Sequence, residues 1–576
     1  MCIRDRGVSA ISPWEHHILF KLRPGVERNR REEFEVDWRS LQRPGFSPDY
    51  REQRYERMDL AYERADWVPT GAGNAILRNN QPLLACIAGK AGSFTSKDHN
   101  FTAGQTVEKQ LIVVNNSREP VRCTCSWRVG LPEPVLGNEE VAVETGQQAN
   151  VPIRFVIPTS AKPGSYEMIA KAAFSNGQSQ EDTFTIHVVP RLALVRDKAK
   201  VALFDPAGET AQLLEEMGLS CEHVDASIDL RSYEILILGK AALTMDPGAP
   251  GPDIGQVRDG LKVVVFEQTP EVLEKRFGFR VVEYGLRNVF PRVPDHPVLA
   301  GLEVEILRDW RGEATIIPPR LRYERSAKFN GAPAVTWCGL TVTRAWRCGN
   351  RGNVASVLIE KPACGDFLPI VDGGFSLQYS PLLEHREGKG MVLFCQMDVT
   401  GRTETEPAAE ILVANLLRYV GDWKPAATRK AFYAGAPAGR EHLEAAGFSL
   451  HTYEGGEIPT DSVLILGPDS PGAPGSAHKD AIGAFLASGG RVLAVGLSQE
   501  DADAVLPVRV TMGQAEHINA FFDPATMDSP LAGIGPADVH SRDPRTLALV
   551  SEDAEPVGDG VLAVAPGGRI VFCQLA

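Results

Sequence analysis

The chain has 576 residues, a formal net charge of -14 and 43% hydrophobic residues, which allows roughly four domains with ordinary cores. The acidic balance disfavours a nucleic-acid partner, because nucleic-acid binding relies on clustered Lys and Arg. No apolar run is long enough to span a bilayer. The ten cysteines show neither metal-ligand spacing nor a disulfide framework. We therefore expect a soluble multidomain protein with no nucleic-acid or membrane partner, no metal and no cofactor, in a compartment that the sequence leaves open.

Both ends of the sequence suggest a truncated reading frame. Residues 1–6 resemble a translated linker scar from a sequencing library and are kept out of fold reasoning. The stretch Gly390–Met397, GMVLFCQM, returns as Gly568–Leu575, GRIVFCQL, which indicates one folding unit used twice. The first copy runs on into an apolar helix at 408–419, whereas the second stops at Ala576. We expect the second unit to be incomplete.

Residues 7–80 are interpreted as the C-terminal remnant of a TIM-type (β/α) barrel with a helical extension. Its first part predicts a short buried strand that ends in Trp14, Glu15 and His16. Chemistry in such barrels lies at the C-terminal ends of strands, where an aromatic ring can stack on a sugar. These three residues are therefore candidate substrate-binding residues, and the alternative is a buried Trp at a domain seam. Glu15 has no assignable partner for glycoside hydrolysis, which needs a pair of carboxylates.

Residues 81–190 alternate apolar and polar side chains with a period of two. Turn signals at 115–117, 163–164 and 175–177 separate the alternating runs at regular spacing. This pattern predicts an immunoglobulin-like (Ig-like) β-sandwich. Cys123 and Cys125 fall two apart on one predicted strand, where they share a face but have a poor geometry for a mutual disulfide.

Two α/β units follow, at 198–422 and 427–576. In the first, an apolar strand at 200–204 precedes a helix that ends at Gly218, and further strands lie at 235–238 and 263–266. The same order recurs in the second unit, with strands at 430–433, 463–466 and 491–495. Continuous apolar strands linked by helices predict parallel sheets covered on both faces. The predicted fold class is therefore a β-sandwich plus two doubly wound α/β domains, preceded by the barrel remnant.

The strand order of both units, and the bend that follows the strand before a helix, resemble the class I glutamine amidotransferase-like fold. The trimerisation domains of some β-galactosidases and the trehalose-utilisation family share this fold. Active amidotransferases place a cysteine at that bend, where a helix N-terminus lowers its pKa and a histidine activates it. Here the bends read Phe266-Glu267-Gln268-Thr269-Pro270 and Gly496-Leu497-Ser498-Gln499-Glu500, without the cysteine. We expect degenerate domains retained for shape or assembly, with no catalytic residue in the chain.

Three further motifs are weighed against structural alternatives. Ser498 carries half of a Gly-x-Ser-x-Gly elbow, but a helix N-cap is the favoured interpretation. Asp295-His296-Pro297 is interpreted as a turn. The stretch 337–379 contains Arg344 and Arg347, which we take as candidate substrate-binding residues because Arg, Trp and Gly-rich turns can line a polyol or carboxylate pocket. An interface loop or structural packing is the favoured alternative for that stretch.

The succession of barrel remnant, sandwich and paired α/β domains is similar to the C-terminal half of bacterial relatives of the β-galactosidases, in glycoside hydrolase families two and forty-two. The motifs that carry this resemblance, Trp38–Phe46 and the repeated Phe-Cys-Gln strand, are not catalytic signatures. The resemblance implies a carbohydrate substrate, a homo-oligomer, and catalytic glutamates on barrel strands outside this chain. The alternative is a non-enzymatic ligand-binding or oligomerisation protein built on degenerate α/β domains.

Overall fold

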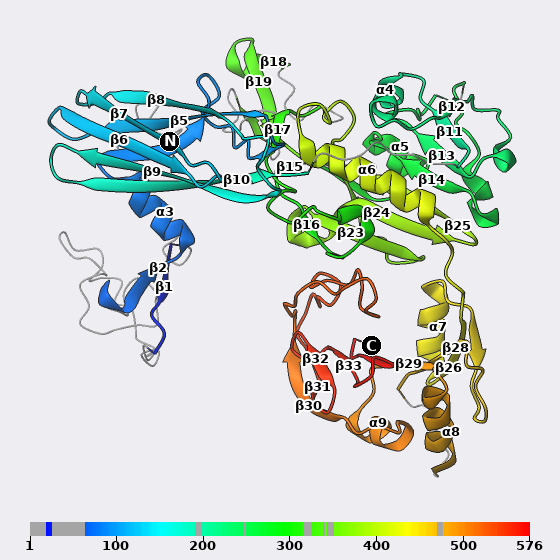
Figure 1. The fold of residues 1–576 in the computed structure, drawn as a ribbon. Helices are drawn as coiled ribbons and strands as arrows, with labels where there is room; N and C mark the ends of the chain where they lie inside the picture. The colour runs from blue at the N-terminus through cyan, green and yellow to red at the C-terminus, as the bar shows by residue number, and fades with distance from the viewer. Residues whose placement is uncertain are drawn as a thin grey trace. The chain divides into compact units, whose positions relative to one another are not determined.

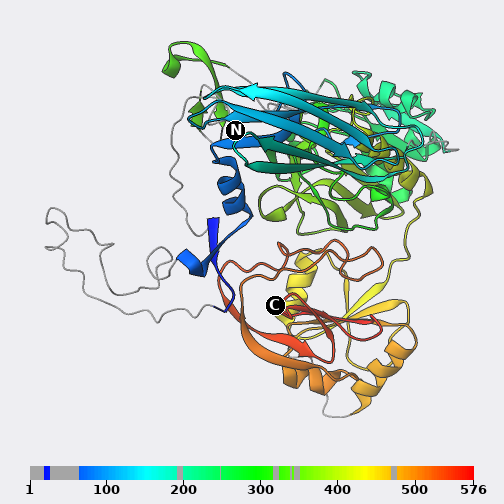
Figure 2. The same cartoon turned by 60° about the vertical axis from the view of Figure 1, so that its left-hand side comes forward.

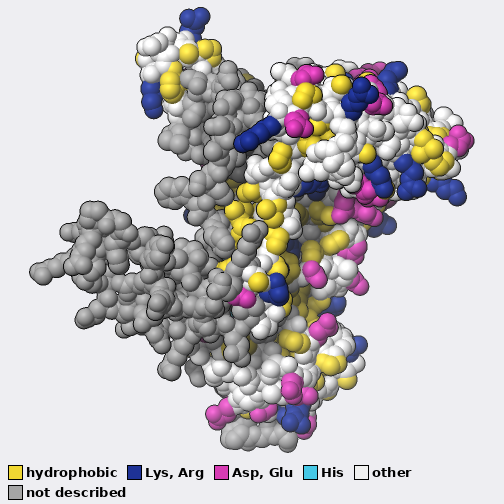
Figure 3. Space-filling view, turned by 90° about the vertical axis from the view of Figure 1, so that its left-hand side faces the viewer, with side chains coloured by type: hydrophobic (Ala, Val, Ile, Leu, Met, Phe, Trp, Pro, Cys, Tyr) yellow, Lys and Arg dark blue, Asp and Glu magenta, His cyan; other side chains and the backbone are white. Residues whose placement is uncertain are grey.

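The computed structural model describes residues 19–25, 64–190, 199–246, 248–315, 324–337, 340–342, 351–468 and 476–575. It is a strand-rich, multi-sheet, multidomain protein (Figures 1 and 2). The chain divides into two compact units, one of residues 1–94, 106–156 and 166–185, the other of residues 95–105, 157–165 and 186–576. Among the described residues, no helix has the length and apolar character needed to cross a membrane. On the face drawn in Figure 3, acidic and basic side chains are interspersed.

The described N-terminal residues form a small antiparallel pair and one helix. Strand β1 (Phe20–Leu22) pairs with β2 (Trp67–Pro69), and α3 (Gly71–Asn79) follows. Thr70 caps α3, because its hydroxyl accepts a hydrogen bond from the Gly73 amide at 3.2 Å. Barrel strands pair in parallel, so this antiparallel pair is not itself part of a barrel wall. Most of the expected barrel remnant lies outside the described residues, and the barrel stays a prediction.

The alternating region forms two sheets. One contains β3 (Leu83–Gly89), β5 (Thr106–Asn115) and β8 (Gln148–Val156). The other has the order β4 (Asn100–Phe101), β10 (Ser179–Val188), β9 (Gly164–Phe174), β6 (Val121–Val129) and β7 (Val135–Val143). Along β6, buried Cys123 and Cys125 alternate with exposed Arg122, Thr124 and Ser126, as a half-buried strand requires. The two thiols are free and lie 3.7 Å apart.

The first α/β domain is built on a ten-stranded sheet. Strands β12 (Glu222–His223), β11 (Val201–Phe204), β13 (Ile235–Leu238), β14 (Lys262–Val265) and β25 (Gly390–Cys395) are parallel neighbours in that order. Antiparallel strands β24 (Tyr379–Glu387), β22 (Ala355–Glu360) and β15 (Val281–Leu286) extend the sheet, and β23 (Phe367–Gly373) and β16 (Phe290–Pro291) branch from it.

Helices and short 3-10 turns cover both faces of this sheet. Helices α4 (Glu209–Glu216) and α6 (Pro407–Asp422) pack into a core that contains Leu203, Leu214 and Leu412. Helix α5 (Pro270–Lys275) and the turns η3 (Leu230–Ser232) and η4 (Ile254–Asp259) pack into a second core around Leu236 and Val263. Residues of one strand alternate between the two cores, which explains why these strands are apolar throughout.

The second α/β domain repeats this plan with fewer strands. Its sheet has the order β27 (Leu450–Thr452), β26 (Lys430–Ala434), β28 (Ser462–Leu466), β29 (Arg491–Val495), β34 (Ile570–Cys573), β33 (Leu562–Val564) and β32 (Glu555–Val557). The strands from β27 to β34 are parallel. Helices α7 (Pro437–Ala445), α8 (Ser476–Ala487) and α9 (Gln499–Val505) accompany it, with an antiparallel pair of β30 (Thr511–His517) and β31 (Arg545–Glu552).

The repeated Phe-Cys-Gln motif occupies the same place in both sheets. In the first domain it ends β25, which pairs in parallel with β14; in the second it ends β34, which pairs in parallel with β29. The interpretation of the repeat as one folding unit used twice is therefore consistent with the strand pairing.

The remaining elements of the described residues are short 3-10 turns and strands. The 3-10 turns are η2 (Arg64–Asp66), η5 (Pro297–Leu299), η6 (Ala327–Phe329) and η7 (Phe375–Leu377). The short strands are β17 (Trp310–Glu313), β18 (Glu324–Ser326), β19 (Ala332–Trp337), β20 (Leu340–Val342) and β21 (Arg351–Gly352).

Candidate functional site

The carboxyl ends of the parallel strands in the first α/β domain bring polar residues to one edge of the sheet. Asp205 follows β11, Lys240 follows β13, Glu267 and Gln268 follow β14, and Asp398 follows β25 by three residues. Ligands of open α/β sheets bind at this edge, where the chain reverses its direction of winding. This edge is therefore the candidate functional site of the domain.

Glu267 stands at the bend where an amidotransferase would carry its cysteine. Its carboxylate accepts hydrogen bonds from the Val399 and Thr400 amides and from the Thr400 hydroxyl, each at 2.9 Å. Burial raises the pKa of Glu267 to about 7, and the nearby Asp398 carboxylate adds to the rise, while the Thr400 amide and Lys240 oppose it. The side chain is therefore fixed by three donors and has only 6% of its surface exposed.

Asp398 and Arg402 form a buried ion pair beside Glu267. Each is about 1% exposed, and the guanidinium also donates to the Arg311 carbonyl at 2.8 Å. The Asp398 carboxylate accepts from the Thr315 amide at 3.1 Å and from the Thr315 hydroxyl at 3.0 Å. Burial raises the pKa of Asp398, whereas Arg402 works against that rise.

Gln268 connects the ends of three neighbouring strands. Its amide nitrogen donates to the Gly239 carbonyl at 2.7 Å, and its side-chain oxygen accepts from the Leu243 amide at 3.2 Å. Its backbone amide donates to the side-chain oxygen of Gln396 at 3.0 Å. With Glu267, Asp398 and Arg402, these contacts cross-link the edge, although the Gln396 side-chain nitrogen and the Arg402 Nε atom are buried without a hydrogen-bond partner.

The bend of the first domain carries no cysteine. The thiol nearest in the sequence pattern, Cys395, is fully buried, and burial together with the Glu267 carboxylate raises its pKa. A reactive thiol instead needs a lowered pKa and access to substrate. Cys395 is therefore a buried residue of the sheet interior and lacks the features of a reactive thiol.

The equivalent bend of the second domain carries Ser498. Its hydroxyl accepts from the Asp501 amide at 3.1 Å and donates to the Asp501 carboxylate at 2.7 Å, and the Ser498 amide donates to the same carboxylate at 3.2 Å. This arrangement is a capping box at the start of α9. The N-cap interpretation of Ser498 is therefore supported over the nucleophile.

Two buried histidines form hydrogen-bond networks that the sequence pattern does not predict. His517 has its Nδ1 atom 2.6 Å from the Asp559 carboxylate and its Nε2 atom 2.7 Å from the Val539 carbonyl. His296, expected in a turn, begins the 3-10 turn η5 and accepts from the Val298 amide at 3.2 Å. Its Nε2 atom lies 3.6 Å from the Glu384 carboxylate, which also accepts from the Tyr419 hydroxyl. Partners this distant in sequence leave no local signal.

The candidate substrate-binding residues from the sequence lie outside the described residues. They are Trp14, Glu15, His16, Arg344 and Arg347, and they stay predictions. From the same stretch as the two arginines, Asp372 is fully buried and ion-paired with Arg292 at 2.6 Å and Lys361 at 2.7 Å. That carboxylate is therefore held in the domain interior between two cations. Across the described ranges, no group of three or more His, Cys, Asp or Glu side chains is placed to hold a metal ion.

Comparisons with known proteins give only partial likenesses. No family model matches the chain, and no curated protein matches it. A CARDB domain from Pyrococcus furiosus is 15% identical over 19% of this chain and 87% of its own, with a TM-score of 0.15. A family 123 glycoside hydrolase from Clostridium perfringens is 14% identical over 23% of this chain and 32% of its own, with a TM-score of 0.15.

A β-glucosidase from Listeria innocua is 12% identical over 19% of this chain and 16% of its own, also with a TM-score of 0.15. The chain thus spans well under two thirds of both of these glycoside hydrolases. Solved structures with a weak, partial likeness to this chain therefore include glycoside hydrolases, and likenesses of this extent carry no argument about its activity.

Proposed function

We propose that this chain supplies the accessory and assembly domains of a carbohydrate-active glycoside hydrolase, with an Ig-like sandwich and two amidotransferase-like α/β domains that act as scaffold. The observation that carries the scaffold role is the closed state of both strand-to-helix bends. Glu267 is held by three donors in the first domain, and Ser498 is held in a capping box in the second. The carbohydrate role is supported by the order of domains, which resembles β-galactosidase relatives.

The experiment is an activity assay on the chain beginning at Gly7, with aryl β-galactosides and aryl β-glucosides as substrates and glutamine as a control substrate for amidotransferase chemistry. We expect no turnover of any of them. Glycoside turnover that disappears in Glu15→Gln would overturn the scaffold role, because it would locate catalysis in the opening segment. Glutamine hydrolysis that disappears in Ser498→Ala would also overturn the scaffold role, because it would locate catalysis in the second α/β domain.

A homo-oligomeric assembly is part of the same proposal, and one exposed aromatic supports it. Phe375, at the start of η7, is 82% exposed, and the next two residues, Ser376 and Leu377, hold left-handed backbone conformations at φ 52° and 57°. Non-glycine residues rarely adopt this conformation. Backbone strain of this kind concentrates at functional sites. In sedimentation velocity runs, we expect Phe375→Ser to weaken self-association. A chain that sediments as a monomer at all concentrations would contradict the assembly role.

The alternative, a non-enzymatic ligand-binding or oligomerisation protein, shares this closed architecture. The upstream reading frame distinguishes the two. Two glutamates at the ends of barrel strands upstream support the hydrolase, since glycoside hydrolysis requires a pair of carboxylates across the bond. A frame without them favours the alternative.

A further inference from the structure

A groove of about 380 Å³ lies at the opposite edge of the first α/β sheet, where the parallel strands begin. Glu234 immediately precedes β13, Lys262 begins β14, and Lys389 immediately precedes β25, so three neighbouring strands supply its floor. The turn η4 supplies one wall, and the segment after α6 supplies another. The volume falls within the range of small-molecule pockets.

Some charged groups around the groove are already engaged by the protein. Arg231 makes a two-pronged ion pair with Asp229, with nitrogen to oxygen distances of 3.0 and 2.8 Å. Lys262 donates from its ammonium to the Gly421 carbonyl at 2.9 Å, which leaves two of its protons for another acceptor. These contacts fix the positions of both cations at the rim of the groove.

Other polar groups face the groove without a partner. Within the described part of the chain, the carboxylates of Glu234 and Asp259 and the ammonium of Lys389 form no hydrogen bond or ion pair. With Lys262, they give the groove two cations and two anions beyond the engaged Arg231. A fully ionised small ligand would meet repulsion from one pair, whereas a ligand that both donates and accepts hydrogen bonds without net charge suits all four.

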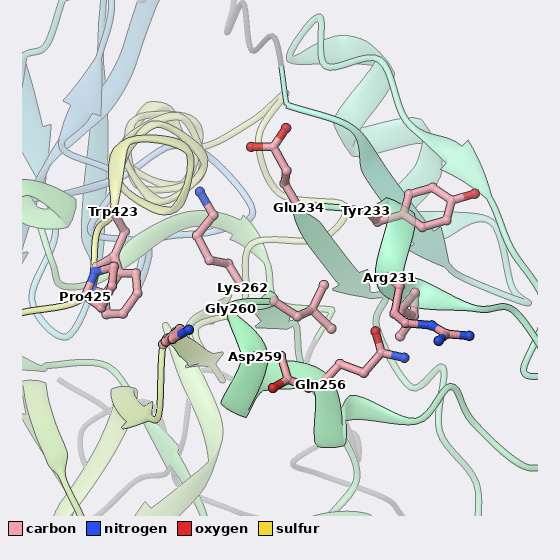
Figure 4. A pocket seen from close by; sticks show the side chains of 12 residues that line it. Arg231, Tyr233, Glu234, Gln256, Asp259, Gly260, Lys262, Trp423 and Pro425 are labelled. Atoms are coloured by element: carbon pink, nitrogen blue, oxygen red, sulfur yellow. The ribbon is translucent and has the colours of Figure 1, made fainter.

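Trp423 gives the groove an aromatic wall. It follows α6 directly and packs partly against the main core of the domain, which fixes the position of its ring. Figure 4 places Trp423 and Pro425 on one side of the groove and Arg231 and Tyr233 on the other, with Lys262 between them. An indole fixed beside hydrogen-bonding groups matches a ligand with an apolar face and a hydroxylated rim.

We propose that this groove binds a neutral sugar, with the ring stacked on Trp423 and the hydroxyls bound by Glu234, Asp259, Lys262 and Lys389. Sugar hydroxyls donate to the carboxylates and accept from the ammonium groups, so each unpartnered group gains a hydrogen bond. Binding at this groove requires no turnover, so the proposal stands or falls independently of the proposed function.

Saturation-transfer difference NMR on the whole chain tests the site, with galactose, lactose and cellobiose as neutral probes. We expect binding of at least one probe, with dissociation constants raised about tenfold by Trp423→Ala. Glu234→Gln and Lys389→Met alter exposed side chains that the fold does not need, and each should raise the dissociation constant about threefold to tenfold. Phe521→Ala removes an aromatic that is 84% exposed and lies outside the groove, and it should leave binding unchanged.

Three results would overturn the site. The first is the absence of binding by every neutral probe. The second is binding that survives all three groove substitutions, which would place the sugar elsewhere. The third is preferential binding of inorganic phosphate, or of glycine as a zwitterionic probe, which would show that the groove selects charge.

Discussion

The two α/β domains share a parallel-strand framework, and the bend after β14 in the first differs from the bend after β29 in the second. Gln396 and Gln574 end equivalent strands, and each side chain bonds the bend beside it: Gln396 accepts from the Gln268 amide at 3.0 Å, and Gln574 donates to the Leu497 carbonyl at 3.2 Å. After this shared element, the first domain buries the ionisable side chain Glu267, whereas the second has the cap residue Ser498. The same framework thus carries a buried carboxylate at one bend and a helix cap at the other.

The largest difference is expected when the buried ion pair of the first domain is broken. Arg402→Met leaves the Asp398 carboxylate buried without its cation, which costs about 3–5 kcal/mol of unfolding free energy. The matched change in the second domain is Arg440→Met, which removes a partly exposed pair with Glu444 and costs less than about 1 kcal/mol. Urea unfolding followed by hydrogen exchange of each domain measures both. Equal losses in the two domains would contradict the comparison.

The second largest difference between the domains is expected in the pH dependence of their stability. The pKa of Glu267 rises from 4.5 to about 7 on folding, so its protonated form is favoured in the folded state. Its contribution is full below pH 4.5 and is lost as the pH rises through about 7, a change of about 3 kcal/mol. Hydrogen exchange of the first domain across this window measures the loss. Glu267→Gln should flatten the profile, and an unchanged profile in that variant would refute the assignment.

The second domain should lose stability at higher pH. Burial lowers the pKa of His517, but the Asp559 carboxylate and the Val539 carbonyl raise it more, so the net pKa lies above 6.5. The stability from the protonated ring is therefore full below pH 6.5 and is lost as the pH rises through the folded-state pKa. Hydrogen exchange around β30 should show this loss in the wild type and not in His517→Gln. A loss that persists in the variant would point to another group.

The sequence predicted the framework better than the site. Period-two alternation predicted the strands between Leu83 and Val188, and continuous apolar strands between helices predicted the parallel sheets, because both patterns are local. The cap role of Ser498 was also predictable, since Asp501 lies three residues away. The hydrogen-bond partners of Glu267, Val399 and Thr400, lie more than 130 residues away in sequence. No local sequence pattern predicts such contacts. Only the position of a charged residue directly after an apolar strand hinted at a buried role.

Removing the shared glutamines should affect both domains alike. Gln396→Leu leaves the Gln268 amide buried without an acceptor, and Gln574→Leu leaves the Leu497 and Ala548 carbonyls without their donor. Each should cost about 1–3 kcal/mol of unfolding free energy, measured by urea unfolding resolved by domain. Gln110→Leu, in β5, serves as a control that should spare both α/β domains. A loss confined to one α/β domain would show that the two glutamines are not equivalent.

The smallest effect is expected at the caps of the helices that follow the two bends. Thr269 accepts from the Val272 amide at 3.4 Å and Ser498 from the Asp501 amide at 3.1 Å, so Thr269→Ala and Ser498→Ala should each cost about 1 kcal/mol of unfolding free energy. Ser498→Asn should restore the stability lost in Ser498→Ala, because asparagine is an equally good cap, yet it has no hydroxyl to act as a nucleophile. Thermal unfolding of the three Ser498 forms measures the cap, and hydrolase assays on the same samples measure the hydroxyl. Full stability of Ser498→Asn with loss of a measurable hydrolase activity would reverse the assignment, since a residue that serves only as a cap has no other role to lose.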